Sequence, residues 1–167
     1  ASSQQVLLAD HTSICDTVSE RVDYLADTYA FSISSLEDVI RFSEIVFICV
    51  KPQSIHSVLD AIKACDYSDT HFVSILAGTP LSTFWDALGA DTTIIRAMPN
   101  TPLQLGKGVT GLSYSGDTDP DIVDFVTHLF QTCGEVHTIE ESLMNIVTAL
   151  SGSGPAFFYK IADIFAK

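Results

Sequence analysis

The sequence predicts an α/β protein in which a doubly wound, mostly parallel sheet is followed by the start of an all-helical domain. Two observations support this fold class. Strand-like apolar runs alternate with amphipathic helical segments up to residue 139, and repeated strand–helix crossovers are typical of a parallel sheet with helices on both faces. From residue 140 onward the pattern contains only helices. We therefore expect a sheet domain over residues 1–139 and the beginning of a helical domain over 140–167.

The first part of the chain is expected to alternate between strands and helices. Val6–Ala9 has the composition of a short buried strand, and a long helix is expected from about Ser13 to Tyr29. Ser34 and Glu37 form a capping box that predicts a short helix, because the hydroxyl and the carboxylate satisfy free backbone amides reciprocally. Ile45–Val50 is a continuous apolar run, which is typical of a strand covered on both faces.

The central part continues this alternation. Lys51-Pro52 ends the preceding strand, and Ser54 is the expected N-cap of a helix with an apolar face at i, i+3, i+4 and i+7 spacing. The residues of that face are Ile55, Val58, Leu59 and Ile62. A helix is then expected at Ser82–Leu88. Further strands are expected at Phe72–Leu76, Thr93–Ala97 and Gly108–Ser113.

The last part contains one more strand and three helices. Asp119-Pro120 predicts a helix start, since a capping carboxylate precedes proline at the first helical position. Its predicted buried stripe is Ile122, Phe125, Val126, Leu129 and Phe130. Cys133-Gly134 ends this helix, and Glu135–Ile139 is the last expected strand. Helices are expected at Ser142–Leu150 and Pro155–Lys167, the latter with buried Phe158, Ile161, Ile164 and Phe165.

Composition narrows the classes of partner. The 167 residues include 21 acidic and 8 basic side chains, which gives a formal net charge of −13. Nucleic acids and anionic membrane surfaces require clustered lysine and arginine, so we expect neither as a partner. The longest apolar run is far shorter than a membrane span, and no signal peptide is visible. The chain does not begin with Met, so a segment upstream is expected to be missing.

The cysteines and histidines predict no metal site. The cysteines Cys15, Cys49, Cys65 and Cys133 contain no C-x-x-C pair, and the five histidines form no H-E-x-x-H or H-x-H pattern. Cysteines within apolar stretches are typical of buried thiols in a reducing compartment. We therefore expect a cytoplasmic protein.

The loops that follow the strands are the expected ligand-binding positions, because ligands of such sheets bind beyond the carboxyl ends of the strands. Asp10 is either an acceptor for a cofactor ribose, which would favour NAD over NADP, or part of a surface turn. Lys51 either faces a cofactor phosphate or ribose or is a solvated strand end. Asn100 either pairs with a nicotinamide carboxamide or bonds its own loop.

Two glycine-containing segments are further candidates for ligand contact. Gly78 permits a tight turn and close approach to a bound ring. The segment Ser151-Gly-Ser-Gly-Pro155 either holds an anion at a helix start or is an ordinary helix–helix turn. The glycine fingerprint G-x-G-x-x-G, which seats a pyrophosphate, does not occur in the sequence.

Three segments together resemble successive blocks of the pyrroline-5-carboxylate reductase family. They are Val50-Lys51-Pro52, the block Ile95-Arg-Ala-Met-Pro-Asn-Thr-Pro102 and the block Thr148-Ala-Leu-Ser-Gly-Ser-Gly-Pro-Ala156. Their order and spacing agree with the family over nearly the whole chain. The resemblance implies a Rossmann-like, dinucleotide-binding domain over residues 1–139, followed by the beginning of a C-terminal helical dimerisation domain over 140–167.

The resemblance also implies an activity and site residues. The family transfers a hydride from NAD(P)H to the imine of 1-pyrroline-5-carboxylate and forms L-proline, the last step of proline biosynthesis, and a homo-oligomer is expected. NADPH is the expected cofactor, with NADH as the alternative. The implied cofactor-binding residues are His11, Cys49, Val50, Lys51, Pro52, Ile75, Leu76, Ala77 and Asn100. The implied substrate-binding residues are Ser151, Gly152 and Ser153.

The sequence departs from the family in several places. The family's first strand and glycine-rich turn are expected to be absent, and the catalytic residues are expected beyond Lys167. Leu36 stands near a position where the family often has a cofactor-contacting asparagine, Leu76 replaces a small residue, and Asn145 replaces a common aspartate. We therefore expect the chain by itself to bind cofactor weakly and to be inactive or poorly active.

Two alternatives to this function remain open at the level of sequence. The chain is either a degenerate, non-catalytic relative that acts as an interaction module, or another oxidoreductase on the same fold. A β-hydroxyacid dehydrogenase would require a catalytic lysine on the helix after the sheet. Lys160 lies in that region, but no glycine-asparagine helix motif accompanies it.

Overall fold

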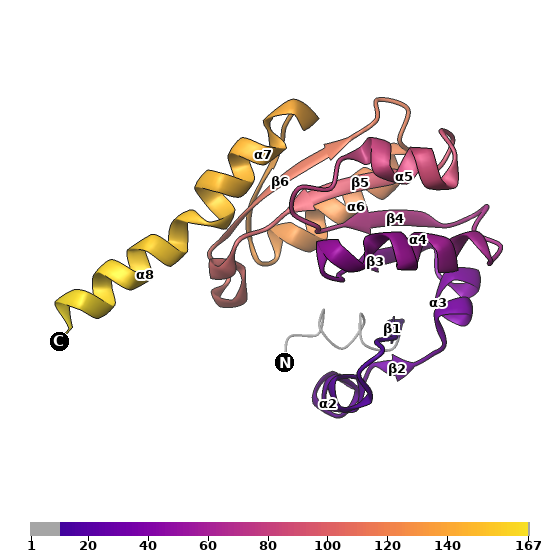
Figure 1. Cartoon of the computed structure of the whole chain (residues 1–167), viewed down its shortest axis with the longest axis horizontal. Helices are drawn as coiled ribbons and strands as arrows, with labels where there is room; N and C mark the ends of the chain where they lie inside the picture. The colour runs from indigo at the N-terminus through magenta and orange to yellow at the C-terminus, as the bar shows by residue number, and fades with distance from the viewer. Residues whose placement is uncertain (1–10, 167) are drawn as a thin grey trace.

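A five-stranded sheet forms the centre of the computed structural model, which describes residues 11–166 (Figure 1). The strand order is β3-β4-β5-β6-β7. The strands are β3 (Ile45–Ile48), β4 (His71–Ser74), β5 (Ile94–Met98), β6 (Gly108–Tyr114) and β7 (Gly134–Thr138). Strands β3, β4 and β5 are parallel, β6 is antiparallel to β5, and β7 is parallel to β6. The predicted mostly parallel sheet is therefore confirmed, with one reversal between β5 and β6.

Helices cover both faces of this sheet, as expected for a doubly wound fold. On one face pack α3 (Leu36–Phe42), α4 (Ile55–Lys63) and α5 (Leu81–Leu88), and on the other packs α6 (Pro120–Gln131). The alternation along β4 explains the two cores, because successive strand residues point to opposite faces. Phe72 lies in the core with α3, α4 and α5, whereas Val73 lies in the core with α6, and both are fully buried.

The start of α6 and the buried face of α4 agree with signals in the sequence. Asp119 caps α6 by accepting a hydrogen bond from the Asp121 backbone N–H, with Pro120 at the first helical position, as predicted. Helix α4 buries Ile55, Leu59 and Ile62, also as predicted. Ser54 precedes α4 without a side-chain capping bond, because the chain enters the helix through a 3₁₀ turn, η1 (Pro52–Ser54). The prediction of a buried Phe125 is wrong: this side chain is exposed at the flank of the stripe.

Before β3, the chain forms a separate two-stranded parallel sheet of β1 (Ser13–Ile14) and β2 (Ser32–Ile33), joined by α2 (Ser19–Tyr29). The prediction of a helix from about Ser13 is therefore wrong at its start. Asp16 accounts for the difference, because its carboxylate accepts a hydrogen bond from the Val18 backbone N–H and turns the chain before the helix. The predicted strand Val6–Ala9 and Asp10 lie outside the described residues.

The N-cap of α3 is Ser35, not Ser34 as the capping box predicted. The Ser35 hydroxyl accepts from the Asp38 backbone N–H at 3.1 Å and donates to the Asp38 carboxylate at 2.7 Å. Ser34 instead continues the pairing of β2, since its backbone N–H donates to the Ile14 carbonyl. The cap has therefore moved one residue along because the preceding residue belongs to the small sheet.

After β7 the described chain is helical: η3 (Glu141–Leu143), α7 (Met144–Val147), the π-helical turn η4 (Thr148–Gly152) and α8 (Gly154–Phe165). Figure 1 shows α8 extending away from the sheet. The prediction that α8 buries four apolar side chains is wrong, because Phe158, Ile161, Ile164 and Phe165 are all exposed. No helix among residues 11–166 is long and apolar enough to cross a membrane.

Candidate functional site

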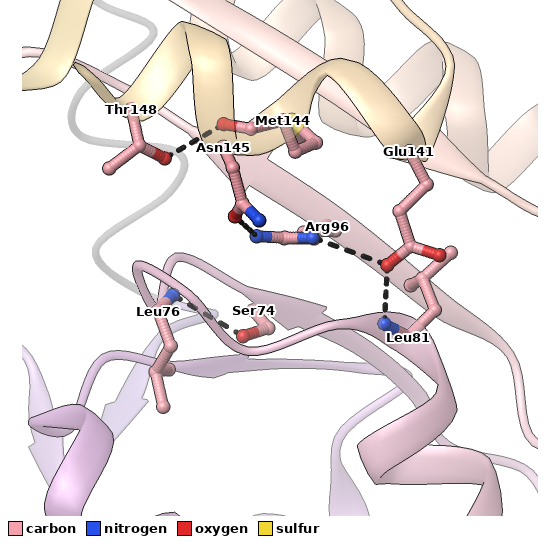
Figure 2. A network of polar contacts seen from close by, with 8 residues as sticks. All are labelled: Ser74, Leu76, Leu81, Arg96, Glu141, Met144, Asn145 and Thr148. Carbon is pink, nitrogen blue, oxygen red and sulfur yellow. Dashed lines mark hydrogen bonds and ion pairs between the residues drawn. The ribbon is translucent and has the colours of Figure 1, made fainter.

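The loops after β3, β4 and β5 lie at one edge of the sheet, because these three strands are parallel. Cys49, Val50, Lys51 and Pro52 follow β3 and are exposed, so they are accessible to a ligand. Ile75 and Ala77 follow β4 and are half-buried and exposed, respectively. Leu76 differs, since its side chain is packed into the core beside α3, α4 and α5. Only the Leu76 backbone is available to a ligand, and its N–H donates to Ser74 Oγ at 3.3 Å (Figure 2).

His11 is the first residue that the structure describes. It lies two residues before β1, and the strand predicted to precede it, Val6–Ala9, lies outside the described residues. The residues that follow β1 are Cys15 and Asp16. The role of His11 as a cofactor contact therefore stays a prediction.

Asp16 and Arg21 are residues that sequence reasoning missed. An oxygen of the Asp16 carboxylate lies 2.8 Å from Arg21 Nη1, and the same side chain accepts from the Val18 backbone N–H at 3.0 Å. The hydrogen bond from Val18, aided by the bond and charge of Arg21, holds the pKa of Asp16 below its usual value. The signal in the sequence was an acidic residue two positions after Ile14 and shortly before an amphipathic helix.

Two thiols lie at corresponding strand ends. Cys15 follows β1 and Cys49 follows β3, and both residues are exposed overall. Partial burial of each sulfur nevertheless raises the pKa of both thiols, and the charge of Asp16 raises that of Cys15 further. Both groups are therefore neutral thiols at neutral pH.

Asn100 connects the loop after β5 to two other parts of the chain. Its Oδ1 accepts from the Val109 backbone N–H at 2.9 Å, and its Nδ2 donates to Ser151 Oγ at 3.1 Å. The alternative that this amide bonds its own loop is therefore not what the structure shows, because both bonds reach beyond the loop, one to β6 and one to the helical segment. A serine 51 residues away along the chain is held beside the carboxyl end of β5.

Ser151 and Gly152 belong to the π-helical turn η4. The backbone N–H of Ser153 donates to the Thr148 carbonyl at 2.9 Å, five residues back, and the Thr148 hydroxyl donates to the Met144 carbonyl at 2.8 Å. A Cβ at Gly152 would lie 3.8 Å from the sulfur of Met98, the last residue of β5. The turn thus lies against the carboxyl end of that strand, and π-helical turns within helices are frequent at functional sites.

Arg96 provides a second polar connection between β5 and the helical segment (Figure 2). Its Nη1 lies 3.3 Å from Glu141 Oε1, and its Nη2 donates to Asn145 Oδ1 at 3.4 Å. The same Glu141 oxygen accepts from the Leu81 backbone N–H at 2.5 Å, at the start of α5. Glu141 therefore connects the buried strand, the loop before α5 and the helical segment at a single carboxylate.

A hollow of about 480 Å³ lies between α5 and the ends of β6 and β7. Its lining comprises Leu81, Trp85, Ser113, Tyr114, Thr138, Ile139, Glu140 and Glu141. None of the predicted cofactor-binding residues lines it, so the candidate site is the edge formed by the loops after β3, β4 and β5. Among residues 11–166, no group of three or more His, Cys, Asp or Glu side chains is arranged to hold a metal ion.

Comparison with known proteins agrees with this arrangement. Residues 3–78 match the family described as NADP oxidoreductase, coenzyme F420-dependent. A pyrroline-5-carboxylate reductase of Mycobacterium tuberculosis is 33% identical over 156 residues, which cover 90% of this chain and 53% of the relative. One from Methanosarcina acetivorans is 37% identical over 128 residues, or 77% of this chain and 47% of the relative. The chain spans about half the length of the curated relatives it matches.

Solved structures show the same fold. The crystal structure of Plasmodium falciparum pyrroline carboxylate reductase with NADP bound has a TM-score of 0.74 and 32% identity, and the match covers 80% of this chain and 51% of that one. The enzyme of Streptococcus pyogenes has a TM-score of 0.80 and 25% identity, over 95% of this chain and 62% of that one. The described elements thus correspond to one part of these longer proteins.

Proposed function

Since this chain belongs to the pyrroline-5-carboxylate reductase family, we propose that it takes part in the reduction of 1-pyrroline-5-carboxylate to L-proline. In that reaction a hydride leaves the reduced nicotinamide and bonds to the carbon of the protonated imine, whose C=N π electrons pass to nitrogen. The cofactor is thereby oxidised and the imine reduced to the amine. A protonated imine accepts hydride readily, so the protein mainly has to hold donor and acceptor face to face.

The observation that carries the proposal is the juxtaposition of Asn100 and Ser151. It brings the helical segment against the carboxyl end of β5, at the edge where ligands of parallel sheets bind. A cofactor on the loops after β3 and β4 and a small substrate at the π-helical turn would then meet at one place. We assign Ser151, Gly152 and Ser153 to the substrate side of this site. The residues of Cys49–Pro52 and Ile75–Ala77 are assigned to the cofactor side.

NADPH is the cofactor we propose, with NADH as the alternative. The Plasmodium falciparum relative has NADP bound, and Lys51 is an exposed cation directly after β3. Gly78 adopts a positive φ of 69° after β4, where a residue with a side chain would be strained, so the chain can turn close to a bound ring. At the end of β1, Asp16 suits the ribose hydroxyls of NADH, whereas Arg21 suits the additional phosphate of NADPH.

The division of the chain follows from the same assignment. We propose residues 1–139 as part of a dinucleotide-binding domain and 140–167 as the beginning of a helical dimerisation domain. Support comes from α8, whose aromatic and aliphatic side chains are exposed along its length. A homo-oligomer would cover this surface. A cytoplasmic location is also proposed, because Cys15, Cys49, Cys65 and Cys133 are all free thiols.

The test is oxidation of NADPH and of NADH by the purified chain, with and without 1-pyrroline-5-carboxylate. Millimolar cofactor is used because we expect weak binding, and a fluorescence titration of each cofactor accompanies the assay. Oxidation that depends on the imine supports the proposal. A folded sample that neither binds either cofactor nor oxidises it in the presence of the imine contradicts the proposal.

A further inference from the structure

The direction of the hydrogen bonds around Asn100 follows from the chemistry of its neighbours. A backbone N–H can only donate, so the Asn100 atom that faces the Val109 N–H at 2.9 Å is the amide oxygen. The other end of the amide is therefore the NH₂ group, which has no acceptor capacity. It lies 3.1 Å from Ser151 Oγ. The serine oxygen is consequently the acceptor of this bond.

This direction leaves the hydrogen of the Ser151 hydroxyl for another group. A serine hydroxyl has one O–H donor and two acceptor lone pairs, and Asn100 uses only a lone pair. Within the described part of the chain, Ser151 donates a hydrogen bond to no side chain and no carbonyl. The residue is only half-buried. The hydroxyl is thus held in place at its oxygen, while its proton has no acceptor among residues 11–166 and is available to a ligand.

The position of Ser151 indicates where that acceptor would lie. The π-helical turn η4 lies against Met98 at the carboxyl end of β5, where the crevice of a doubly wound sheet receives its ligand. The π-turn also lets Ser151 project toward Asn100 while the flanking helices α7 and α8 keep regular geometry. The donor is therefore presented to the proposed site.

The chemistry of the substrate restricts which atom can accept. An imine must be protonated to take up hydride readily, so its nitrogen carries a hydrogen and is a donor. The ring carbons offer no acceptor. The carboxylate is then the acceptor that the substrate presents to a hydroxyl.

We propose that Asn100 is a positioning residue that orients the Ser151 hydroxyl as a hydrogen-bond donor to the carboxylate of the cyclic imino acid. The inference rests on the proposed function for the identity of the ligand, and it assigns the recognition of one functional group to one pair of residues. It also gives Asn100 a role other than pairing with the nicotinamide.

Asn100→Asp is the variant that separates this role from a merely structural one. A carboxylate can still accept from the Val109 N–H, but its second oxygen can only accept as well. Ser151 must then donate to the new carboxylate, so the connection between the two segments persists while the hydroxyl proton is used up. A structural role would survive this reversal, whereas donation to a ligand would not.

The experiment is a titration of the isotope-labelled chain with L-proline, L-prolinamide and pyrrolidine, observed by NMR at the backbone amides. L-Proline presents the carboxylate, L-prolinamide a neutral acceptor and pyrrolidine no acceptor. We expect L-proline to shift the resonances of Ser151 and Gly152. Ser151→Ala and Asn100→Asp should each weaken L-proline binding about tenfold, as expected for one hydrogen bond to a charged group. The double variant should bind no more weakly than Ser151→Ala alone.

The controls address charge and folding. The new carboxylate in Asn100→Asp could weaken L-proline binding simply by repelling the carboxylate of the ligand. L-Prolinamide has no carboxylate, so a weakening of its binding in Asn100→Asp would show that the loss of the Ser151 donor is the cause. Pyrrolidine should bind equally to all forms, and Ser151→Thr, which retains a hydroxyl, should restore binding of L-proline. If Asn100→Asp does not fold, the comparison of Ser151→Ala with Ser151→Thr decides the question.

Several outcomes would overturn the inference. They are unchanged L-proline binding in Ser151→Ala, L-proline binding that leaves Ser151 unshifted, and absence of L-proline binding at its solubility limit. Dependence of NADPH binding rather than L-proline binding on Ser151 would assign the acceptor to the cofactor and also overturn it. Imine-dependent cofactor oxidation that is unchanged in Ser151→Ala would retain the proposed function and reject the inference. A chain that oxidises no cofactor but binds L-proline through Ser151 would retain the inference and reject the proposed function.

Discussion

Arg96 and Glu141 form an ion pair with 3.3 Å between Nη1 and Oε1, although the arginine side chain is buried in the sheet and the glutamate is partly exposed. The same carboxylate oxygen accepts from the Leu81 backbone N–H (Figure 2). A buried guanidinium needs such a partner, since an unpaired buried charge is costly. The pair therefore makes the folding of the sheet depend on the segment that follows β7.

Glu141→Ala is expected to lower the free energy of unfolding by about 2 kcal/mol, because it leaves the Arg96 charge and the Leu81 N–H without this acceptor. Urea denaturation followed by circular dichroism measures the change. Glu140→Ala is the matched control. Glu140 is the residue next to Glu141, and its carboxylate is exposed and takes part in no ion pair among the described residues. Equal effects of the two substitutions would show that the ion pair contributes nothing to stability.

Gly134→Ala is expected to be among the most destabilising single substitutions, with a loss of about 3 kcal/mol or more. Gly134 has a φ of 151°, and a Cβ there would overlap the backbone of Gly108, with which it pairs at the start of β6 and β7. Thermal unfolding of the variant provides the measurement. Gly116→Ala, where a Cβ meets open space, should unfold within a few degrees of the parent chain.

Substitution of Asp16 and Arg21 should change cofactor preference in opposite directions. Arg21→Gln is expected to weaken NADPH binding more than NADH binding, because it removes the cation available to the additional phosphate. Asp16→Asn should weaken NADH binding more. Since the pKa of Asp16 lies below its usual value, the carboxylate is charged throughout the neutral range, and the contribution of Asp16 to NADH binding should not vary between about pH 6 and pH 8. Parallel fluorescence titrations would show this, and a shift of both cofactors by the same factor would contradict it.

Cys15 and Cys49 should react slowly with iodoacetamide at pH 7.5. Partial burial raises the pKa of both thiols, so the reactive thiolate is scarcer than in an unfolded chain. Raising the pH toward the elevated pKa should speed alkylation, and mass spectrometry of peptides follows each site separately. Because a neutral thiol is favoured in the folded state, its contribution to stability is present at neutral pH and declines as the pH rises past the pKa of the unfolded thiol. Alkylation in the folded chain as fast as in urea would rule this out.

The elements with strong periodicity were predictable from sequence. Helices α4 and α6 and the strands of the large sheet lie close to where their apolar spacing, and for α6 also its Asp119 cap, placed them, because local pattern and burial agree there. Around Asp16 they do not agree, since one side-chain bond to the Val18 N–H ends the extended segment and delays the helix. The apolar stripe of α8 also misled prediction, because periodicity cannot say whether a covering surface is present.

The candidate site was predictable in outline only. The rule that ligands bind beyond strand ends identified the loops after β3, β4 and β5, but it depends on the location of each strand. It missed Asp16 because β1 (Ser13–Ile14) was predicted to be the start of a helix. The bond between Asn100 and Ser151 joins residues 51 positions apart. No local pattern encodes such a pairing, because it arises only when the helical segment packs against β5.

The π-helical turn at Thr148–Gly152 makes the helical segment sensitive to its residue count. Each residue of an α-helix rotates the chain by about 100°, and a π-turn accommodates one more residue than an α-turn would. Deletion of a single residue here would let α7 continue into α8 as one regular helix. The whole outer face of α8 would then rotate by roughly a quarter turn relative to the sheet, and Ser151 would no longer face Asn100. Insertions and deletions at this turn would therefore alter both ligand recognition and the orientation of every side chain downstream.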